Sequence, residues 1–370
     1  MFSELIEQVK AQHSNELPFV IYRKPREEKV NAILQVTDDL HEINEYVATG
    51  FVFAPFDSKK PAVLLKADII NSAIVPPQVF DLKREAKTVK VDASQKARHL
   101  KLVNKAIDEI SRNVIKKVVL SRKVEFSCEV SIFRLFEKML NSYESAFCYL
   151  WYHPKVGTWL GATPEILLKT ENQSFTTMSL AGTQNADKEQ MIAWGKKEIQ
   201  EQQLVTDYIV DVLKNKVAGL RVSDKESIKA GQLWHLRTKL IGRIQKGDLT
   251  SVIQALHPTP AVCGIPLKEA KKFILKNEGY AREYYTGFLG ELNMKSNIER
   301  TKTSRNQENK AYRSIKNCTT LFVNLRCMQL NNDKAMVYVG GGVTLDSIAE
   351  KEWQETVDKS TTILKVLDDN

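Results

Sequence analysis

Segments with the alternating apolar pattern of β-strands outnumber the helical segments in this chain, and the two kinds do not alternate along it. Strict alternation of strands and helices would favour a parallel sheet. The observed order therefore predicts an α+β fold with largely antiparallel sheets. Strands are predicted at Phe19–Tyr22, Val30–Val36, Tyr46–Phe53, Lys117–Phe126, Ala146–Tyr152, Gly157–Leu160, Glu165–Thr170, Ser174–Ser179, Gln232–Ile244, Tyr284–Leu292, Thr320–Leu330 and Ala335–Val339.

The predicted helices have apolar residues at helical spacing and recognisable first turns. Pro266 suits the first turn of one of them, where its missing N–H is not needed. Ser347 and Glu350, three residues apart, predict a capping box at the start of the last helix. The helices are predicted at Ser94–Asn113, Lys188–Leu213, Pro266–Lys276 and Ser347–Leu367.

Composition places the chain among ordinary globular proteins. Its 370 residues are 43% hydrophobic and 27% charged, which excludes a disordered, collagen-like or coiled-coil protein. No uninterrupted apolar stretch approaches 18 residues. Glutamates also occur among the first ten residues, where a signal peptide needs an apolar core. The five cysteines show no CxxC spacing, which indicates reduced thiols. We therefore expect a cytoplasmic protein without a membrane partner.

The net charge of +9 fits an anionic small-molecule substrate, a weak nucleic-acid surface or simple solubility. The segment Met294–Asn317 is the most basic, with seven Lys or Arg against two Glu. Nucleic-acid binding would favour aromatic residues among these cations, and Tyr312 is the single one. We interpret the segment as a solvated hairpin loop or insertion and expect no nucleic-acid partner.

Two pairs of glutamates lie on predicted helices at a spacing of three residues, so each pair projects from one helix face. Four such carboxylates could hold Mg²⁺, which accepts oxygen ligands and keeps several waters. A solvated helix face is the alternative interpretation of each pair. The pairs are Glu198 with Glu201 and Glu352 with Glu355.

Six sequence motifs connect these glutamates to a known family. Their content and order resemble the chorismate-utilising enzymes, the family of isochorismate synthase, salicylate synthase, anthranilate synthase component I and aminodeoxychorismate synthase. The motifs are KKVVLSR (116–122), LGATPEILL (160–168), SLAGT (179–183), HPTPAVCGIP (257–266), LFVNLRC (321–327) and YVGGGVTLDS (338–347).

The resemblance covers residues 94–367, which it marks as the catalytic chorismate-binding region. Residues 1–93 form a less similar, β-rich N-terminal part. The resemblance implies one large domain over residues 1–370, in which two mostly antiparallel sheets pack together with helices outside.

Two residues are candidates for acid–base chemistry. Lys117 enters a predicted strand, and burial there would favour a neutral amine that can take a proton from water, whereas a solvated lysine is the alternative. Glu165 follows Pro164 and begins an apolar strand, where burial would keep the carboxyl group protonated as a general acid. A glutamate in water at the edge of a strand is its alternative. The resemblance implies that Lys117 is the general base and Glu165 the acid.

The pattern predicts that Arg326 lies in a strand on the face of Phe322, Asn324 and Met328, where its fork would bind a carboxylate or point outward. The resemblance implies that Arg326 contacts a substrate carboxylate. It also implies that His257, otherwise a satisfied core histidine, lies by the substrate ring. The other substrate-binding residues implied by the resemblance are Ala181, Gly182, Thr183, Ala261, Tyr285, Gly340, Gly341, Gly342 and Lys359.

Departures from the family pattern are few. Gln184 stands where an Arg is usual, and Glu283 replaces a common Gly. No acid–His pair follows Glu201. These differences concern residues around the site and leave the four glutamates in place.

The choice among family members depends on the nucleophile. Family members that add ammonia usually carry Gln at the position of Lys117, and aminodeoxychorismate synthase has a Lys at the position of Ala181. No Cys-His-Glu amidotransferase segment is present, so no glutamine amidotransferase subunit is expected. Water is then the nucleophile, which leaves isochorismate synthase or salicylate synthase. Ala261 in HPTPAV resembles the former.

The implied activity is the Mg²⁺-dependent conversion of chorismate to isochorismate, by attack of water at C2 and loss of the C4 hydroxyl. Such an isomerase could serve menaquinone or siderophore biosynthesis. A hypothesis of another class is a non-catalytic protein that binds anions or nucleic acid through its positive charge.

Overall fold

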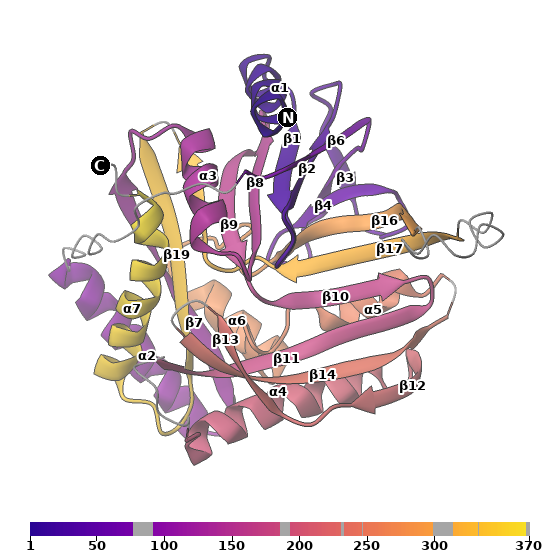
Figure 1. The fold of residues 1–370 in the computed structure, drawn as a ribbon. Coiled ribbons are helices and arrows are strands. Elements are labelled where there is room, and N and C mark those ends of the chain that lie inside the picture. The colour runs from indigo at the N-terminus through magenta and orange to yellow at the C-terminus, as the bar shows by residue number, and fades with distance from the viewer. Residues whose placement is uncertain are drawn as a thin grey trace.

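The computed structural model describes residues 1–76, 92–185, 193–230, 233–245, 247–298, 314–331 and 333–367. Within this part of the chain, two large sheets pack together and the helices lie outside them (Figure 1). All strand pairs of these residues are antiparallel. The predicted α+β class is therefore confirmed.

The first sheet has nine strands, and the N-terminal strands form one end of it. In spatial order it consists of β15 (Gly264–Ile265), β7 (Lys117–Ser127), β19 (Lys334–Val343), β18 (Cys327–Asn331), β9 (Gly157–Thr163), β8 (Phe147–His153), β1 (Phe19–Arg23), β2 (Lys29–Leu34) and β6 (Ile69–Ile74).

The second sheet has ten strands, nine along its main path and β13 (Glu226–Ala230), which pairs with β14 beside that path. In spatial order the main path consists of β12 (Val217–Val222), β14 (Leu233–Ile244), β11 (Ser174–Asn185), β10 (Ile166–Glu171), β17 (Ser314–Val323), β16 (Phe288–Ile298), β4 (Gly50–Ala54), β5 (Ala62–Leu65) and β3 (His41–Ile43).

The N-terminal strands complete both sheets and do not form a sheet of their own, because β1, β2 and β6 end the first sheet whereas β4, β5 and β3 end the second. The single-domain organisation over residues 1–370 and the division near residue 93 stay predictions.

An aromatic core joins the two sheets. Phe147 of the first sheet stacks on Phe322 of the second with 4.2 Å between ring centroids. Phe53 and Trp151 form a second contact across the sheets at 4.9 Å. Such pairs add about 0.5–1.5 kcal/mol each to the burial of apolar area. This core holds the two sheets in a fixed relation at the place where the functional site forms.

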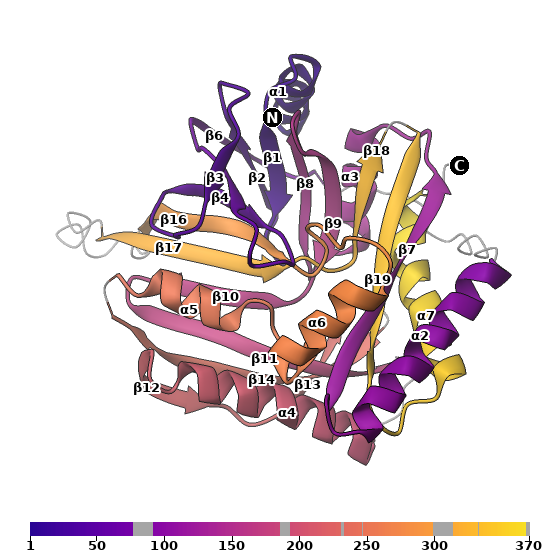
Figure 2. The same ribbon diagram turned by 180° about the vertical axis from the view of Figure 1, so that it is seen from behind.

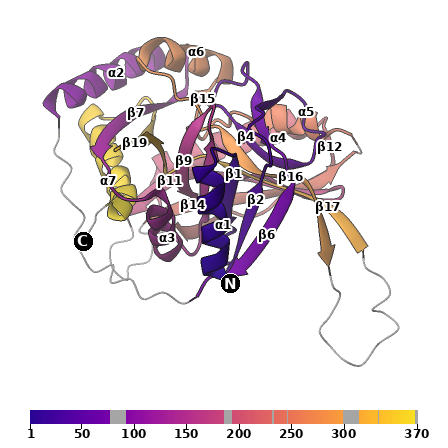
Figure 3. The ribbon, with the colours of Figure 1, turned by 90° about the horizontal axis from the view of Figure 1, so that it is seen from above.

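Helices cover the outer faces. Those on the first sheet are α1 (Phe2–Ser14), α3 (Ile132–Ser142) and α7 (Ala349–Leu367). The second sheet is covered by α4 (Lys196–Leu213) and α5 (Leu249–Leu256). Figures 2 and 3 show the remaining two lying near each other beside β7: α2 (Ala93–Ser111) and α6 (Leu267–Asn277). No helix of the described residues is long and apolar enough to cross a membrane.

The sequence prediction is wrong in two places that matter for function. The predicted strand Thr320–Leu330 is divided between β17 of the second sheet and β18 of the first, and Arg326 lies in the connection with a φ of +46°. The predicted strand Tyr284–Leu292 starts later, at Phe288, so Tyr285 lies in the preceding turn.

Other differences concern the ends of elements and short helices. Helices α1, α3 and α5 were not predicted. In the basic segment, residues 294–298 and 314–317 are paired strands, and the rest of it lies outside the described residues. The predicted start of a helix at Lys188 also lies outside them. Ser347 accepts a hydrogen bond from the backbone of Thr344 at 3.0 Å, two residues before α7 begins.

Candidate active site

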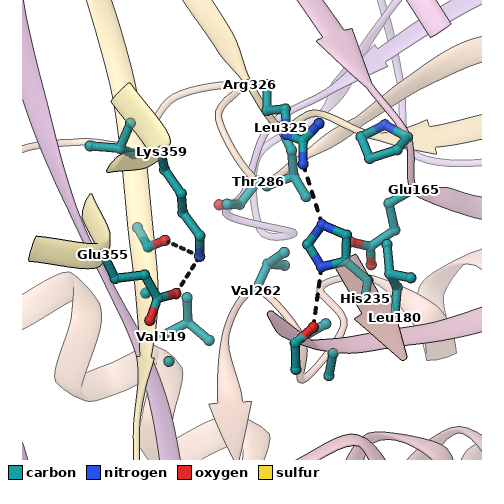
Figure 4. A pocket seen from close by; sticks show the side chains of 18 of the residues that line it. Val119, Glu165, Leu180, His235, Val262, Thr286, Leu325, Arg326, Glu355 and Lys359 are labelled. Atoms are coloured by element: carbon teal, nitrogen blue, oxygen red, sulfur yellow. Dashed lines mark hydrogen bonds and ion pairs between the residues drawn. The ribbon is translucent and has the colours of Figure 1, made fainter. Parts of the chain in front are cut away.

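A cavity of about 170 Å³ lies where the two sheets meet, closed on its sides by α4 and α7. Its lining comes from β7 and β19 of the first sheet, from β11 and β14 of the second, and from the two chain segments that cross between the sheets. Figure 4 shows Lys359 and Glu355 on one side of this cavity and Arg326, His235 and Glu165 on the other. The site therefore combines residues that lie far apart in the sequence.

The two crossing segments are held beside each other by the backbone. Pro164 and Glu165 connect β9 to β10, and residues 324–326 connect β17 to β18. The carbonyl oxygen of Glu165 accepts from Val323 N at 2.9 Å, and that of Arg326 accepts from Ala162 N at 3.1 Å. Main-chain hydrogen bonds thus fix the positions from which the acid and the arginine enter the cavity.

Two residues that line the cavity have left-handed backbone. Arg326 has a φ of +46° and Thr286 a φ of +61°, an unusual conformation for a β-branched residue. Glu283, which replaces the Gly expected from the family pattern, has a φ of +51°. This conformation explains why glycine would suit that position. Each such residue costs about 1–3 kcal/mol, which the surrounding structure must offset.

Glu165 is buried, with 4% of its surface exposed. Desolvation raises the pKa of its carboxyl group from 4.5 to about 8, and the positive charges of Lys117 and Arg326 oppose this shift without cancelling it. The carboxyl group is therefore mostly protonated at neutral pH. A buried carboxylic acid in a cavity can donate a proton to a leaving group.

Lys117 is fully buried in β7, and its Nζ lies 2.7 Å from Glu201 Oε1 in an ion pair. Gly342 leaves room for this pair. A Cβ at Gly342 would lie 2.9 Å from Glu201 Oε1 and 3.3 Å from Lys117 Cε. The glycine thus permits a lysine from a strand and a glutamate from a helix to meet at the edge of the cavity.

The opposite end of the glycine run holds a second lysine. Lys359 Nζ donates to Glu355 Oε1 at 2.6 Å and to the carbonyl oxygen of Gly340 at 3.0 Å. The hydroxyl of Tyr285 would lie 3.0 Å from a Cβ at Gly340, so this position too requires a small residue. The alternative of a merely solvated Glu–Lys pair is not what the structure shows, because both residues line the cavity.

His235 is a cavity residue that the sequence analysis missed. Its Nδ1 lies 3.2 Å from the carbonyl oxygen of Gly182, which can only accept, so Nδ1 carries the proton. Its Nε2 lies 3.3 Å from Arg326 Nη2, which can only donate. Burial, with the charges of Arg326 and Lys359, lowers the pKa of His235 to about 3. A neutral histidine therefore orients the arginine fork; its place inside the predicted strand Gln232–Ile244 was the available signal.

His257 lies away from the cavity lining. Its Nε2 lies 2.8 Å from the carbonyl oxygen of Pro55, and its ring packs edge-on against Phe288 at 4.9 Å. Burial lowers the pKa of His257 to about 4, so the ring is neutral. These contacts are those of a satisfied core histidine, and the expected contact of His257 with a substrate ring stays a prediction. Ala261 of the same motif does line the cavity.

The small residues predicted on β11 are also placed at the site. Ala181 and Gly182 line the cavity, next to a register shift in the pairing of β11 with β14. Thr183 continues the same strand, and its side chain lies outside the described part of the structure.

The four predicted metal ligands come from α4 and α7. A Cβ at Gly341 would lie 3.6 Å from Glu355 Oε1 and 3.7 Å from Glu352 Oε2. Glu198 lies against Gly182: a Cβ added at Gly182 would lie 3.2 Å from the Cβ of Glu198. In the described residues, no group of three or more His, Cys, Asp or Glu is close enough to hold a metal ion.

The donor set nevertheless fits a hard cation. All four candidates are carboxylates. Glu198, Glu201 and Glu355 line the cavity, and Glu352 lies beside Gly341, which also lines it. Mg²⁺ needs few direct protein ligands, since waters and substrate oxygens complete its octahedron. Two of them also pair with lysines through Oε1, Glu201 with Lys117 and Glu355 with Lys359.

Comparison with known families agrees with this architecture. A family model described as chorismate binding enzyme matches residues 62–301, and a second with the same description matches residues 311–365. The chain belongs to the chorismate-binding enzyme family. The resemblance expected from the six motifs is confirmed.

Individual relatives of this chorismate-binding enzyme are distant. Isochorismate synthase EntC of Escherichia coli (strain K12) is 27% identical over 266 residues, which are 68% of this chain and 62% of the relative. The chain thus spans less than two thirds of the length of that relative.

Solved structures share the fold. Isochorismate synthase DhbC from Bacillus anthracis, described as specific for 2,3-dihydroxybenzoate, has a TM-score of 0.78 at 21% identity over 100% of both chains. Anthranilate synthase component I from Streptococcus pneumoniae has a TM-score of 0.65 at 17% identity, covering 94% of this chain and 90% of its own. Because the same fold carries two different names, the activity has to be argued from the site.

Proposed function

We propose that this chorismate-binding enzyme is an isochorismate synthase, which converts chorismate to isochorismate. The observation that carries the proposal is the protonated, buried Glu165 in a cavity that also presents Arg326 and Lys359 and adjoins Lys117. Chorismate has two carboxylates and a ring hydroxyl that must leave with a proton. The cavity supplies cations for the former and an acid for the latter.

Lys117 acts as the base. The side-chain amine of Lys117, in the form without its extra proton, takes a proton from a water molecule as the water oxygen attacks C2 of the ring. The ring double bonds shift, and the bond between C4 and its hydroxyl oxygen breaks. Glu165 donates its proton to the departing hydroxyl, which leaves as water. One water is consumed and one is released, so the reaction is an isomerisation without oxidation.

Substrate orientation is assigned to the cationic residues. Arg326, held by His235, offers a planar fork to one carboxylate, and Lys359 offers its ammonium to the same or the second carboxylate. Mg²⁺, held by Glu198, Glu201, Glu352 and Glu355 directly or through water, would neutralise the ring carboxylate when bound. Fixing the diene in this way converts an intermolecular attack into one between positioned groups.

Two residues and one relative support isochorismate synthase over other family members. Lys117 provides a base for water, and Ala181 leaves no lysine nucleophile at its position. EntC, the relative at 27% identity, is an isochorismate synthase. A cytoplasmic enzyme acting without a glutamine amidotransferase subunit is part of the same proposal.

The test is incubation of the purified protein with chorismate and Mg²⁺, with products separated by chromatography and pyruvate followed by a lactate-dehydrogenase-coupled assay. Isochorismate should accumulate in equilibrium with chorismate, pyruvate should stay at background, and added ammonium should leave the rate unchanged. Stoichiometric pyruvate with salicylate would instead indicate a salicylate synthase. Ammonium-dependent anthranilate would refute the assignment of Lys117, and absence of any conversion would favour a non-catalytic anion-binding protein.

Full turnover in excess EDTA would refute the metal assignment alone. The Glu165→Gln variant is the negative control for the whole assay, because it keeps the shape of the side chain and removes the acidic proton.

A further inference from the structure

A second concave site lies on the far side of β7, between α2 and the end of α6. Figure 2 shows these three elements beside one another. The groove has a volume of about 470 Å³ and shares no lining residue with the active-site cavity. We call it the α2 groove and define it by its cationic and aromatic lining: Arg98, Lys101, Lys105, Arg122, Lys123 and Tyr280.

The α2 groove carries a concentrated positive charge. Arg98, Lys101 and Lys105 project from one face of α2 at spacings of three and four residues, and Lys123 comes from β7. In the described part of the chain, no carboxylate forms an ion pair with any of the five cations. Burial and the charge of Arg122 lower the pKa of His99 to about 4, so that histidine adds no charge at neutral pH.

The acidic residue of the groove is committed elsewhere. Glu278 Oε1 accepts from the backbone N–H of Ser121 at 2.8 Å, and the carboxylate forms an ion pair with the buried Arg282. Glu278 is therefore neutralised by a cation outside the groove. The remaining lining of the groove contains no other carboxylate.

Arg122 forms the floor of the groove and has 8% of its surface exposed. Its Nε donates to Thr356 Oγ1 at 2.8 Å, and its guanidinium lies 4.3 Å from the centroid of the Trp353 ring. These contacts fix the guanidinium plane. Its Nη2 is buried and has no hydrogen-bond partner among the described residues. A buried donor without a partner costs about 1–3 kcal/mol or more for a charged group, unless a ligand satisfies it.

We propose that the α2 groove binds a small anion with at least two negative charges carried on phosphate groups. Arg122 supplies a fixed positive charge at the floor, and the lysines of the lining supply ammonium groups, of which that of Lys105 donates to Asn277 Oδ1 at 2.8 Å. A phosphate accepts hydrogen bonds from several directions at once, which suits a groove whose cationic residues come from both α2 and β7. The site is separate from the proposed chemistry and makes no use of it.

Two features favour a small ligand over nucleic acid. The fixed donor lies at the bottom of a groove, where a bulky duplex backbone would not reach it. The aromatic residue of the lining, Tyr280, hydrogen-bonds to Ser121 Oγ at 2.6 Å and is not an exposed stacking platform.

The experiment is calorimetric titration of the full chain with inorganic pyrophosphate at low ionic strength, without chorismate or Mg²⁺. The test variant is Lys101→Gln/Lys105→Gln, which changes two exposed side chains on α2. The matched control is Lys268→Gln/Lys272→Gln, an exposed pair with the same spacing on α6 that does not line the groove. Circular dichroism confirms that both variants are folded.

The wild type and the control should bind pyrophosphate equally, and the test variant should bind at least about tenfold more weakly. Binding should also weaken as salt is raised. Equal binding by all three proteins would place the anion elsewhere and overturn the proposal, as would absence of binding by the wild type at millimolar pyrophosphate.

Two competitor arms test the ligand class. Citrate should compete more weakly than pyrophosphate, and equal competition would overturn the preference for phosphate. A short DNA duplex that binds the wild type more tightly than pyrophosphate, and loses affinity in the same variant, would assign the groove to nucleic acid. Because no substrate is present, failure here leaves the proposed isomerase activity untouched, and the reverse also holds.

Discussion

Glu165→Gln should lower the activity of the protein and raise its stability at neutral pH. The amide keeps the size of the carboxyl group and its place beside Pro164, but it has no acidic proton to give to the leaving hydroxyl. General acid catalysis contributes about 10²–10⁴-fold, so kcat for chorismate should fall at least about a hundredfold. In the wild type, activity should also decline as pH rises above about 8, where Glu165 ionises.

The gain in stability follows from the same pKa. Since the folded-state value of about 8 exceeds the unfolded value of 4.5, the unfolded chain releases this proton first as pH rises. The contribution of Glu165 to the free energy of unfolding is fully present below pH 4.5 and is lost progressively between pH 4.5 and 8. The loss is about 1 kcal/mol at pH 5 and about 3 kcal/mol at pH 7. Gln cannot ionise and avoids the loss.

The assay is urea unfolding of both proteins at pH 5 and pH 7. The difference in unfolding free energy between Glu165→Gln and the wild type should be about 2–3 kcal/mol larger at pH 7 than at pH 5. The contributions of the other titrating groups cancel in this difference, because both proteins contain them. The control is Glu129→Gln, an exposed glutamate that should show no such change. A difference independent of pH would refute the view that folding keeps Glu165 protonated.

Five further substitutions probe the rest of the cavity. Lys117→Ala should lower kcat about a hundredfold or more while the protein stays folded, measured by chorismate turnover and circular dichroism. Glu201→Gln and Glu355→Gln should each abolish the response of activity to Mg²⁺, and an unchanged Mg²⁺ titration in both would remove them from the ligand set. Gly342→Ala should lower kcat/KM about tenfold by displacing the Glu201 carboxylate, with little change in Tm; wild-type kinetics would mean that this carboxylate can move without cost. Arg326→Lys keeps the charge but loses the fork, so KM should rise about tenfold more than kcat falls, whereas an unchanged KM would take Arg326 out of substrate binding.

The spacing of apolar residues along the sequence was sufficient to predict most of the helices and strands. The helix at Ser94–Asn113 is found as α2, because Val103, Ala106 and Ile110 are buried on one face and Asp92 caps its start. Short helices such as α5 were missed because eight residues give too few turns for a pattern, and their burial depends on contacts with distant segments.

The candidate site was predictable where motifs carried it and not where tertiary contacts decide it. Motif order led to Lys117 and Glu165, whose burial depends on contacts that the pattern of a single strand does not contain. His257 and His235 show the limit. Both sit among apolar residues in the sequence, and only the packing reveals that the first bonds to a core carbonyl while the second faces the cavity.

The segments that cross between the sheets explain why this site is hard to predict and easy to test. Glu165 and Arg326 leave the regular alternation of either sheet, so a period of two residues assigns their side chains to the wrong surroundings. The hydrogen bonds that hold both crossings join main-chain atoms, from Val323 N to Glu165 O and from Ala162 N to Arg326 O, so they use neither side chain. Substitutions at Glu165 and Arg326 therefore change the chemistry of the cavity without removing what positions its walls, and a loss of activity in these variants reports on the side chain itself.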